Sequence, residues 1–193
     1  MYSKKNKILF IHPQKCAGSS IKRSLRKTFG YESFIPNAHD KETKPDCGHW
    51  TLSQFDYYLE DDLKDFFKFS VVRNPWDRAV SYYFYLVTKQ NYKKTFGLFC
   101  NDYYLREDSY QLKQKLLLNK RSVLDFIIRF ENLEEDFKIA MSKMGIQDFA
   151  QLEKLDHNTG RRNRDYRPHY NERTKNIVAD LCEWEIKKFG YKF

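Results

Sequence analysis

The sequence predicts a single α/β domain of three layers, in which a central parallel sheet is flanked by helices. Short apolar stretches of strand character alternate with amphipathic helical stretches, and few sequences typical of hairpins occur. The chain has 193 residues, which is enough for one domain with a substantial core and short for two. Because no repeat, low-complexity linker or domain boundary is evident, one domain is expected to cover residues 1–193.

The first strand and helix are expected near the amino end. Residues 7–12 (KILFIH) contain a run of large apolar side chains that Pro13 stops. Residues 19–29 have apolar side chains at helical spacing, and Gly30 is expected to end this helix. A short helix that ends at Leu59 is expected next, capped at its start by a hydroxyl side chain.

The clearest second strand is residues 66–72 (FFKFSVV), which are nearly all apolar, as in a buried parallel strand. Directly after it, Asn74 can cap a helix and Pro75 can take the first helical position. The apolar face of this helix is expected to consist of five side chains, Ala79, Val80, Tyr83, Phe84 and Val87.

The rest of the chain is expected to add one strand and two long helices. Residues 126–130 (FIIRF) are predicted to form the strand, and residues 131–145 an amphipathic helix that ends at its glycine. A final helix is expected from Asn171 to Lys188. Residues 91–120 have no clear period, and short helical pieces are expected there.

Positive charge is unevenly distributed over the sequence. The net charge is +9, but residues 1–31 contain eight Lys or Arg and no acid, and residues 161–175 contain six against two acids. Two separate basic segments on a nearly neutral body indicate that both face one anionic ligand. Solvated surface charge is the alternative for each segment alone.

The sequence gives no indication of a metal site or a membrane span. The four cysteines form no C-x-x-C pair, so neither zinc nor disulfides are expected. No apolar run approaches the roughly 18 residues that a membrane helix needs. No cleavage pattern follows the basic amino end, and a cytoplasmic protein is therefore expected.

The segment HPQKCAGSS (residues 12–20), between the first strand and helix, has the composition of an anion-binding turn. A helix N-terminus offers N–H groups and partial positive charge, and glycine lets the backbone approach an anion closely. Gly18, Ser19 and Ser20 fit this task. Lys15 precedes the glycine and the first glycine of G-x-x-x-x-G-K-[ST] is missing, so this is not the loop of nucleotide hydrolases. An ordinary strand–helix connection is the alternative.

Two segments together resemble the sulfotransferases, in the branch that includes carbohydrate (heparan 2-O-like) enzymes and their small bacterial relatives. IHPQKCAGSSI resembles the family's 5′-phosphosulfate loop, and FSVVRNPWDRAVSYYFYL its 3′-phosphate segment, R-x-P-x-x-R-x-x-S. RFENLEEDF and the last 28 residues also resemble the family, whereas the likeness weakens across residues 91–122.

The resemblance implies a P-loop-like nucleotide-binding fold and the donor 3′-phosphoadenosine 5′-phosphosulfate (PAPS), with 3′-phosphoadenosine 5′-phosphate (PAP) as product and no metal. It implies that Lys15 contacts the leaving-group oxygen and that the donor's 5′ end is held by five residues, Lys15, Ala17, Gly18, Ser19 and Ser20.

Residue chemistry agrees with a donor that carries anions at both ends. Arg73, at a strand end, can clamp the 3′-phosphate with its guanidinium, and Ser81 can donate its hydroxyl. A surface ion pair is the alternative for Arg73, and simple packing for Ser81. In the family a late basic loop also covers the nucleotide, which points to Arg162 and Arg164.

Sulfuryl transfer to a hydroxyl needs a group that removes a proton, and histidine titrates in the right range. Of five histidines, His49 lies between the two phosphate motifs and opens a short helix, as the family's histidine base does. We therefore expect His49 to be the base; a structural histidine is the alternative, with His12 the next candidate for the base.

The expected reaction is in-line transfer of a sulfuryl group to a hydroxyl-bearing acceptor, most reasonably a carbohydrate, without nucleic acid as partner. Two alternatives stay open: a kinase-like nucleotide-dependent phosphotransferase, and a basic module that binds nucleic acid. Neither the acceptor, the sulfated position nor the oligomeric state follows from the sequence.

Overall fold

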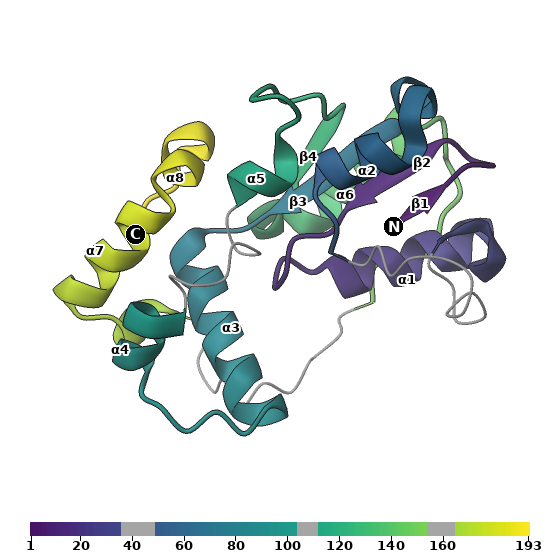
Figure 1. Cartoon of the computed structure of the whole chain (residues 1–193). Helices are drawn as coiled ribbons and strands as arrows, with labels where there is room; N and C mark the ends of the chain where they lie inside the picture. Colours follow the sequence, from purple (N-terminus) through teal and green to yellow (C-terminus); the bar gives the residue numbers. More distant parts are fainter. Residues whose placement is uncertain (36–48, 104–111, 154–164) are drawn as a thin grey trace. The chain divides into compact units, whose positions relative to one another are not determined.

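The computed structural model describes most of the chain (Figure 1), namely residues 1–35, 49–103, 112–153 and 165–193. These residues fold as two compact units, which are described here one at a time. Unit 1 consists of Met1–Val72 and Gln114–Leu155, and unit 2 of Arg73–Lys113 and Asp156–Phe193.

Unit 1 contains a four-stranded sheet in the order β1-β2-β3-β4. The strands are β1 (Tyr2–Ser3), β2 (Ile8–Ile11), β3 (Phe67–Val72) and β4 (Phe126–Arg129). The three predicted strands pair in parallel, which confirms the α/β class. The sheet as a whole is mixed, since β1, a strand that the sequence did not predict, pairs antiparallel with β2. Only four residues join these two strands, and so short a connection cannot cross over to a parallel partner.

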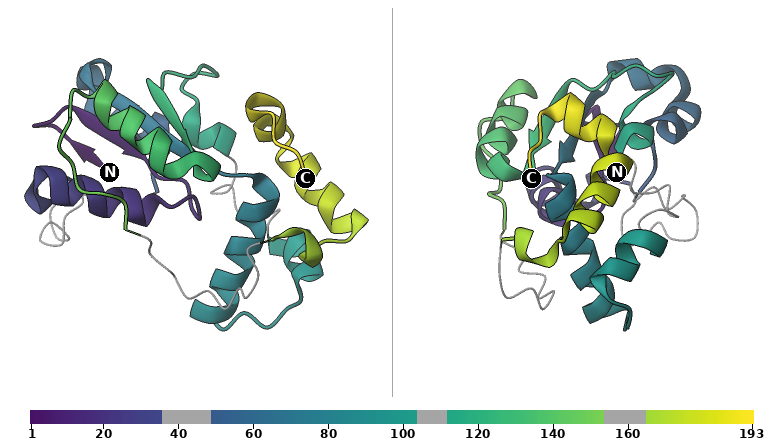
Figure 2. Two further views of the ribbon diagram at one scale, coloured as in Figure 1. Left: turned by 180° about the vertical axis from the view of Figure 1, so that it is seen from behind. Right: turned by 90° about the vertical axis from the view of Figure 1, so that its left-hand side faces the viewer.

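Helices cover both faces of this sheet, as the sequence predicts. The core on one face joins alternate residues of β2, β3 and β4 to α1 (Gly18–Phe29) and α6 (Leu133–Lys143). On the opposite face, α2 (Leu52–Leu59) packs through Phe55 against the ring of Tyr2. Figure 1 shows α2 in front of the sheet, and the view from behind in Figure 2 shows α6 on the other side.

Local sequence signals set the ends of the unit 1 helices. Gly30 ends α1 with a φ of 91°, a conformation that favours glycine. Thr51 caps α2 in a capping box with Gln54, so the expected hydroxyl cap is present. After α6, Gly145 takes a φ of 76°. In the part predicted as helical pieces, α5 spans Leu112–Leu116.

Unit 2 is helical and is built around α3 (Pro75–Lys89), with α4 (Phe96–Leu98), α7 (Glu172–Leu181) and α8 (Glu183–Phe189). The predicted cap is confirmed, because the side chain of Asn74 accepts hydrogen bonds from the first turn of α3 and Pro75 occupies its first position. The predicted apolar face is partly wrong. Tyr82 and Leu86 are buried, whereas Val87 is exposed, because the buried positions follow a 3–4 spacing from Ala79.

The final predicted helix is divided in two. Asn171 begins α7 with a capping box. At Cys182 the backbone leaves the helical range (φ −106°, ψ 21°), and a second helix, α8, begins at Glu183. Glu185 of α8 is buried beside Arg78 of α3, with 2.9 Å between a carboxylate oxygen and Nη2. The second arginine of the R-x-P-x-x-R pattern therefore has a partner inside unit 2.

Candidate active site

The connection from β2 to α1 has an unusual backbone. Lys15 and Ala17 both have a φ of 60°, a left-handed conformation that is strained for residues other than glycine, while Cys16 between them does not. Alternation of this kind turns successive N–H groups toward one side and makes a concave site for anions. No side chain of the described residues caps α1, so its first turn keeps N–H groups for a ligand.

Gly18 is needed in this segment because a neighbouring side chain leaves no room for a Cβ atom. A Cβ atom at Gly18 would lie 1.7 Å from Cδ2 and 2.0 Å from Nε2 of His12, which is far inside any allowed contact. The ring of His12 therefore lies directly on the backbone at the start of α1. It also stacks on Phe10 of β2, with 5.9 Å between ring centroids.

His12 is neutral in the folded chain. Its side chain is buried, and the pKa of His12 lies well below its usual value, chiefly because of desolvation and then because of the nearby positive charges of Lys22 and His49. Its Nδ1 atom has no hydrogen-bond partner among the described residues. These observations fit a ring that shapes the segment and do not support His12 as the base.

His49 lies beside this segment; it is exposed and precedes the first residue of α2 by three positions. Its ring centroid is 4.9 Å from that of His12, and its Nδ1 is 3.3 Å from the backbone carbonyl oxygen of His12. A carbonyl oxygen can only accept, so Nδ1 carries a proton, and in the neutral form of this ring Nε2 is the basic nitrogen. This is the tautomer that a general base near the segment needs.

The backbone of His49 is held by Lys115 of α5. The Lys115 ammonium nitrogen donates to the His49 carbonyl oxygen at 2.6 Å, and Lys115 is only 3% exposed. Lys115 was not predicted as a site residue, because it lies in the stretch without a clear period. The structure thus brings together three basic groups in unit 1, on His12, His49 and Lys115.

The two serines of the segment are positioned as donors. Ser19 is half-buried and Ser20 is buried, and neither hydroxyl is hydrogen-bonded to another residue of the described ranges. Together with the N–H groups of Gly18 and its neighbours, they offer donors at the start of α1. An anionic group with several oxygens fits this set of donors.

The second predicted phosphate site lies in unit 2. Arg73 is buried, and its Nε donates to the carboxylate of Asp77 at 2.7 Å. Arg73 thus forms an ion pair, but a buried one and not the surface pair considered from the sequence. Ser81 follows Asp77 by one helical turn, on the same side of α3, and its half-buried hydroxyl has no hydrogen bond to another described residue. Arg162 and Arg164 lie outside the described residues.

Tyr166 adds a hydroxyl to this part of unit 2. The side-chain amide of Asn74, the residue after Arg73, donates to Tyr166 Oη at 3.3 Å and to the Lys192 carbonyl oxygen at 2.9 Å. Burial raises the pKa of Tyr166, so its hydroxyl stays protonated at neutral pH. This network fixes the turn between β3 and α3, where Arg73 lies.

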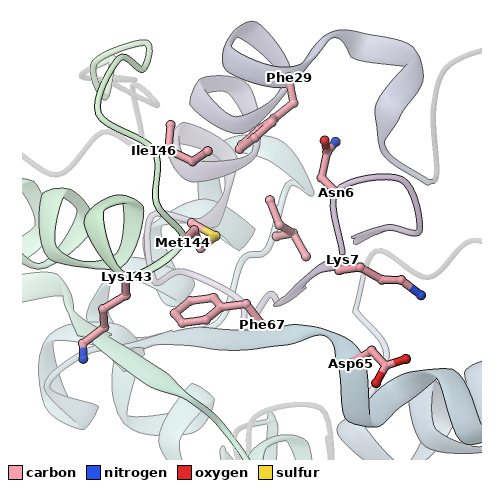
Figure 3. Close-up of a pocket in the computed structure, with 9 residues that line it drawn as sticks. Asn6, Lys7, Phe29, Asp65, Phe67, Lys143, Met144 and Ile146 are labelled. Atoms are coloured by element: carbon pink, nitrogen blue, oxygen red, sulfur yellow. The ribbon is translucent and has the colours of Figure 1, made fainter.

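A recess in unit 1 lies at the opposite edge of the sheet, before the strands begin (Figure 3). Its volume is about 300 Å³ and its base is apolar. Its two ammonium groups do not converge, because that of Lys7 lies over the Phe66 ring and that of Lys143 over the Phe126 ring. Ligands of parallel sheets bind at the carboxyl ends of strands, so this recess is no candidate for an anionic donor.

Comparison with known proteins decides the family. The model of the family described as "Sulfotransferase family" matches residues 1–192. The chain belongs to the sulfotransferase family. No curated protein and no solved structure matches it. This sulfotransferase is therefore a transferase enzyme, and the family match supports neither the kinase-like phosphotransferase nor the nucleic-acid-binding module.

The described part of this sulfotransferase contains no helix long and apolar enough to cross a membrane. Within the same ranges, no three His, Cys, Asp or Glu side chains gather into a group that could hold a metal ion. Sulfotransferases generally use PAPS as donor. The left-handed residues and the uncapped N-terminus at the start of α1 are features that suit an anion.

Proposed function

We propose that this sulfotransferase transfers the sulfuryl group of PAPS to a hydroxyl group of a carbohydrate. The observation that carries the proposal is the backbone of residues 15–18, where two left-handed residues precede an uncapped helix N-terminus. Strain of this kind costs roughly 1–3 kcal/mol per residue and persists where function requires it. A nucleotide donor supplies the anion that such a site binds.

The residues of this segment would have different roles at the donor's 5′ end. Backbone N–H groups of Ala17 and Gly18, with the hydroxyls of Ser19 and Ser20, hold the phosphosulfate oxygens. Lys15 neutralises the phosphate oxygen from which sulfur departs. In the reaction, a bond forms between the acceptor oxygen and sulfur while the sulfur–oxygen bond to phosphate breaks, and PAP leaves with the extra negative charge.

His49 would accept the acceptor's hydroxyl proton at Nε2. The hydrogen bond from Nδ1 to the His12 carbonyl fixes the tautomer and leaves Nε2 with its lone pair. His12 itself is buried, and its lowered pKa makes it a poor proton acceptor. His49 is exposed, which gives an acceptor hydroxyl access to its ring.

The donor's 3′-phosphate would be bound by Arg73 and Ser81, with Arg162 and Arg164 as further contacts. Arg73 is the first residue after β3, and β3 pairs in parallel with β2, so both phosphate motifs begin where neighbouring strands end. The matched family spans both units, which supports their working as one domain over residues 1–193. The cysteines of the described residues are free, which fits a cytoplasmic protein.

Nucleotide binding tests the donor assignment. PAP should raise the melting temperature, and adenosine monophosphate at the same concentration should do so much less, since it lacks the 3′-phosphate. A ligand that binds only the folded chain at a hundredfold excess over Kd stabilises it by about 2.7 kcal/mol. Equal stabilisation by both nucleotides would exclude a pocket for the 3′-phosphate.

Two variants test the roles in transfer, measured with labelled PAPS across a panel of glycans and small alcohols. His49→Ala should leave PAP affinity nearly unchanged and lower turnover by roughly 10²–10⁴-fold, the usual contribution of a positioned base. Lys15→Ala should weaken donor binding and slow transfer together, because its charge meets the donor before and during reaction. If folded His49→Ala retains near-normal turnover, the base is another group.

A further inference from the structure

Lys115 is a buried cation with no acid partner among the described residues. Within these ranges its ammonium group forms no ion pair, and its one hydrogen bond goes to the His49 carbonyl oxygen at 2.6 Å. Burial lowers the pKa of Lys115. Its neighbours on α5, Leu112 and Leu116, are buried apolar side chains. An apolar residue would fill this position at lower electrostatic cost, because an unpaired buried charge is destabilising.

We propose that Lys115 is a positioning residue for His49. It holds the peptide carbonyl of His49 while the His12 carbonyl holds the ring, so that both the backbone and the imidazole of one residue are fixed by hydrogen bonds. The inference rests on the proposed function, in which His49 is the base. Residues that act through such anchors matter because a displacement of about 1 Å can slow a reaction by roughly 10²-fold.

The arrangement explains why a lysine stands at this position. His49 is exposed and precedes the first residue of α2 by three positions, so the helix does not fix its peptide group. Lys115 reaches it from α5, which is 66 residues away along the chain. The hydrogen bond therefore joins two distant segments of unit 1 at the residue whose orientation the reaction depends on.

The test compares Lys115→Met with Lys68→Met. Lys68 is a matched control, because it is also a buried lysine of unit 1 that donates to a backbone carbonyl oxygen at 2.6 Å, that of Phe66. It differs in having the Asp125 carboxylate 3.3 Å away. Lys68→Met should lower the melting temperature and leave turnover per folded molecule unchanged. Lys115→Met should leave the melting temperature unchanged or raise it, yet lower kcat by roughly 10²-fold with little change in the KM for PAPS.

The same measurement in a His49→Ala background shows whether Lys115 acts through His49. Lys115→Met should have no further effect on kcat there, since the group that it orients is gone. An equal loss in both backgrounds would overturn the proposal, and so would a fall in melting temperature as large as that of Lys68→Met. Kinetics use the panel glycan that gives the highest rate with labelled PAPS.

A spectroscopic readout needs no acceptor. In ¹⁵N NMR spectra of the free protein, the His49 ring should be the Nδ1-protonated tautomer in the wild type and a mixture of tautomers in Lys115→Met. An unchanged His49 spectrum overturns the inference. If Lys115→Met retains full activity while His49→Ala loses it, the inference is wrong and the proposed function stands. If His49→Ala retains activity, the base assignment itself is wrong.

Discussion

Gly18→Ala tests the contact between the 12–20 segment and the ring of His12. Gly18 is the first residue of α1 and has no positive φ, so helix propensity alone predicts that alanine stabilises the chain by about 0.5–1 kcal/mol. Packing predicts the opposite, because the new Cβ would lie 1.7 Å from Cδ2 of His12. The sign of the change therefore shows which of the two effects is larger.

The size of the destabilisation by Gly18→Ala depends on how far the His12 ring can move. An ordinary contact of 3.4 Å requires the ring to retreat by about 1.7 Å. The ring is buried, with Phe10 stacked at 5.9 Å and His49 at 4.9 Å between centroids, so it cannot move without displacing a neighbour. Overpacking costs about 1–3 kcal/mol, and an overlap as deep as 1.7 Å belongs in the upper half of that range, about 2–3 kcal/mol. After the gain from helix propensity, a net destabilisation of about 1–2.5 kcal/mol remains. For a chain of this length the melting temperature should fall by roughly 2–10 °C.

Thermal denaturation with and without PAP measures both the loss of stability and the loss of nucleotide binding. Gly18→Ala should melt earlier and lose most of the PAP-dependent shift, because the donors at the start of α1 move with the backbone. Gly97→Ala is the control, since a Cβ there meets only Thr95 Oγ1 at 3.9 Å within the helix α4. A Gly18→Ala protein that melts later than the wild type, with its PAP shift intact, would refute the contact. His12→Ala in the same chain should remove most of the penalty.

Three further predictions concern single contacts. Arg78→Met leaves the Glu185 carboxylate buried without its partner and should destabilise the fold by about 3–5 kcal/mol in urea denaturation; a loss below about 1 kcal/mol contradicts it. The lowered pKa of folded His12 means that the unfolded chain binds more protons below about pH 6.5, so stability should fall as pH drops through that value, by at most about 1.4 kcal/mol per pH unit. His12→Asn should flatten this dependence, and an unchanged slope contradicts burial as its cause. Ser81→Ala should weaken PAP binding about tenfold in calorimetry and leave adenosine 5′-phosphosulfate binding unchanged; equal weakening of both contradicts a 3′-phosphate contact.

The three parallel strands and several helix ends were predictable from the sequence because their causes are local, whereas β1 and the break at Cys182 were not predicted. Thr51 and Asn74 cap the helices that follow them through bonds that span two or three residues, and Gly30 supplies a backbone angle that few other residues adopt. The apolar runs of β2 and β3 identify buried parallel strands in the same way. Local chemistry of this kind does not depend on the rest of the fold.

The supporting residues of the candidate site were not predictable, because their causes are contacts between distant segments. Lys115 lies among residues without a clear period, and its proposed role is evident only from its contact with His49, 66 positions away. Arg78 matches a motif position, yet its guanidinium is buried against Glu185, 107 positions away. Motif matching predicts the residues that face a ligand, whereas contacts between distant segments reveal the residues that would support them.

The segment from Lys15 to Gly18 shows that the residue types of a motif do not by themselves reveal why each residue is needed. The sequence suggests that glycine is present so that the backbone can approach an anion closely. In the structure Gly18 lies in α1 with no positive φ, and the left-handed positions are Lys15 and Ala17. Glycine is needed instead for space, because the His12 ring occupies the place of its Cβ. Substituting glycine at Ala17 should therefore relieve strain and retain PAP binding, whereas any side chain at Gly18 should impair it.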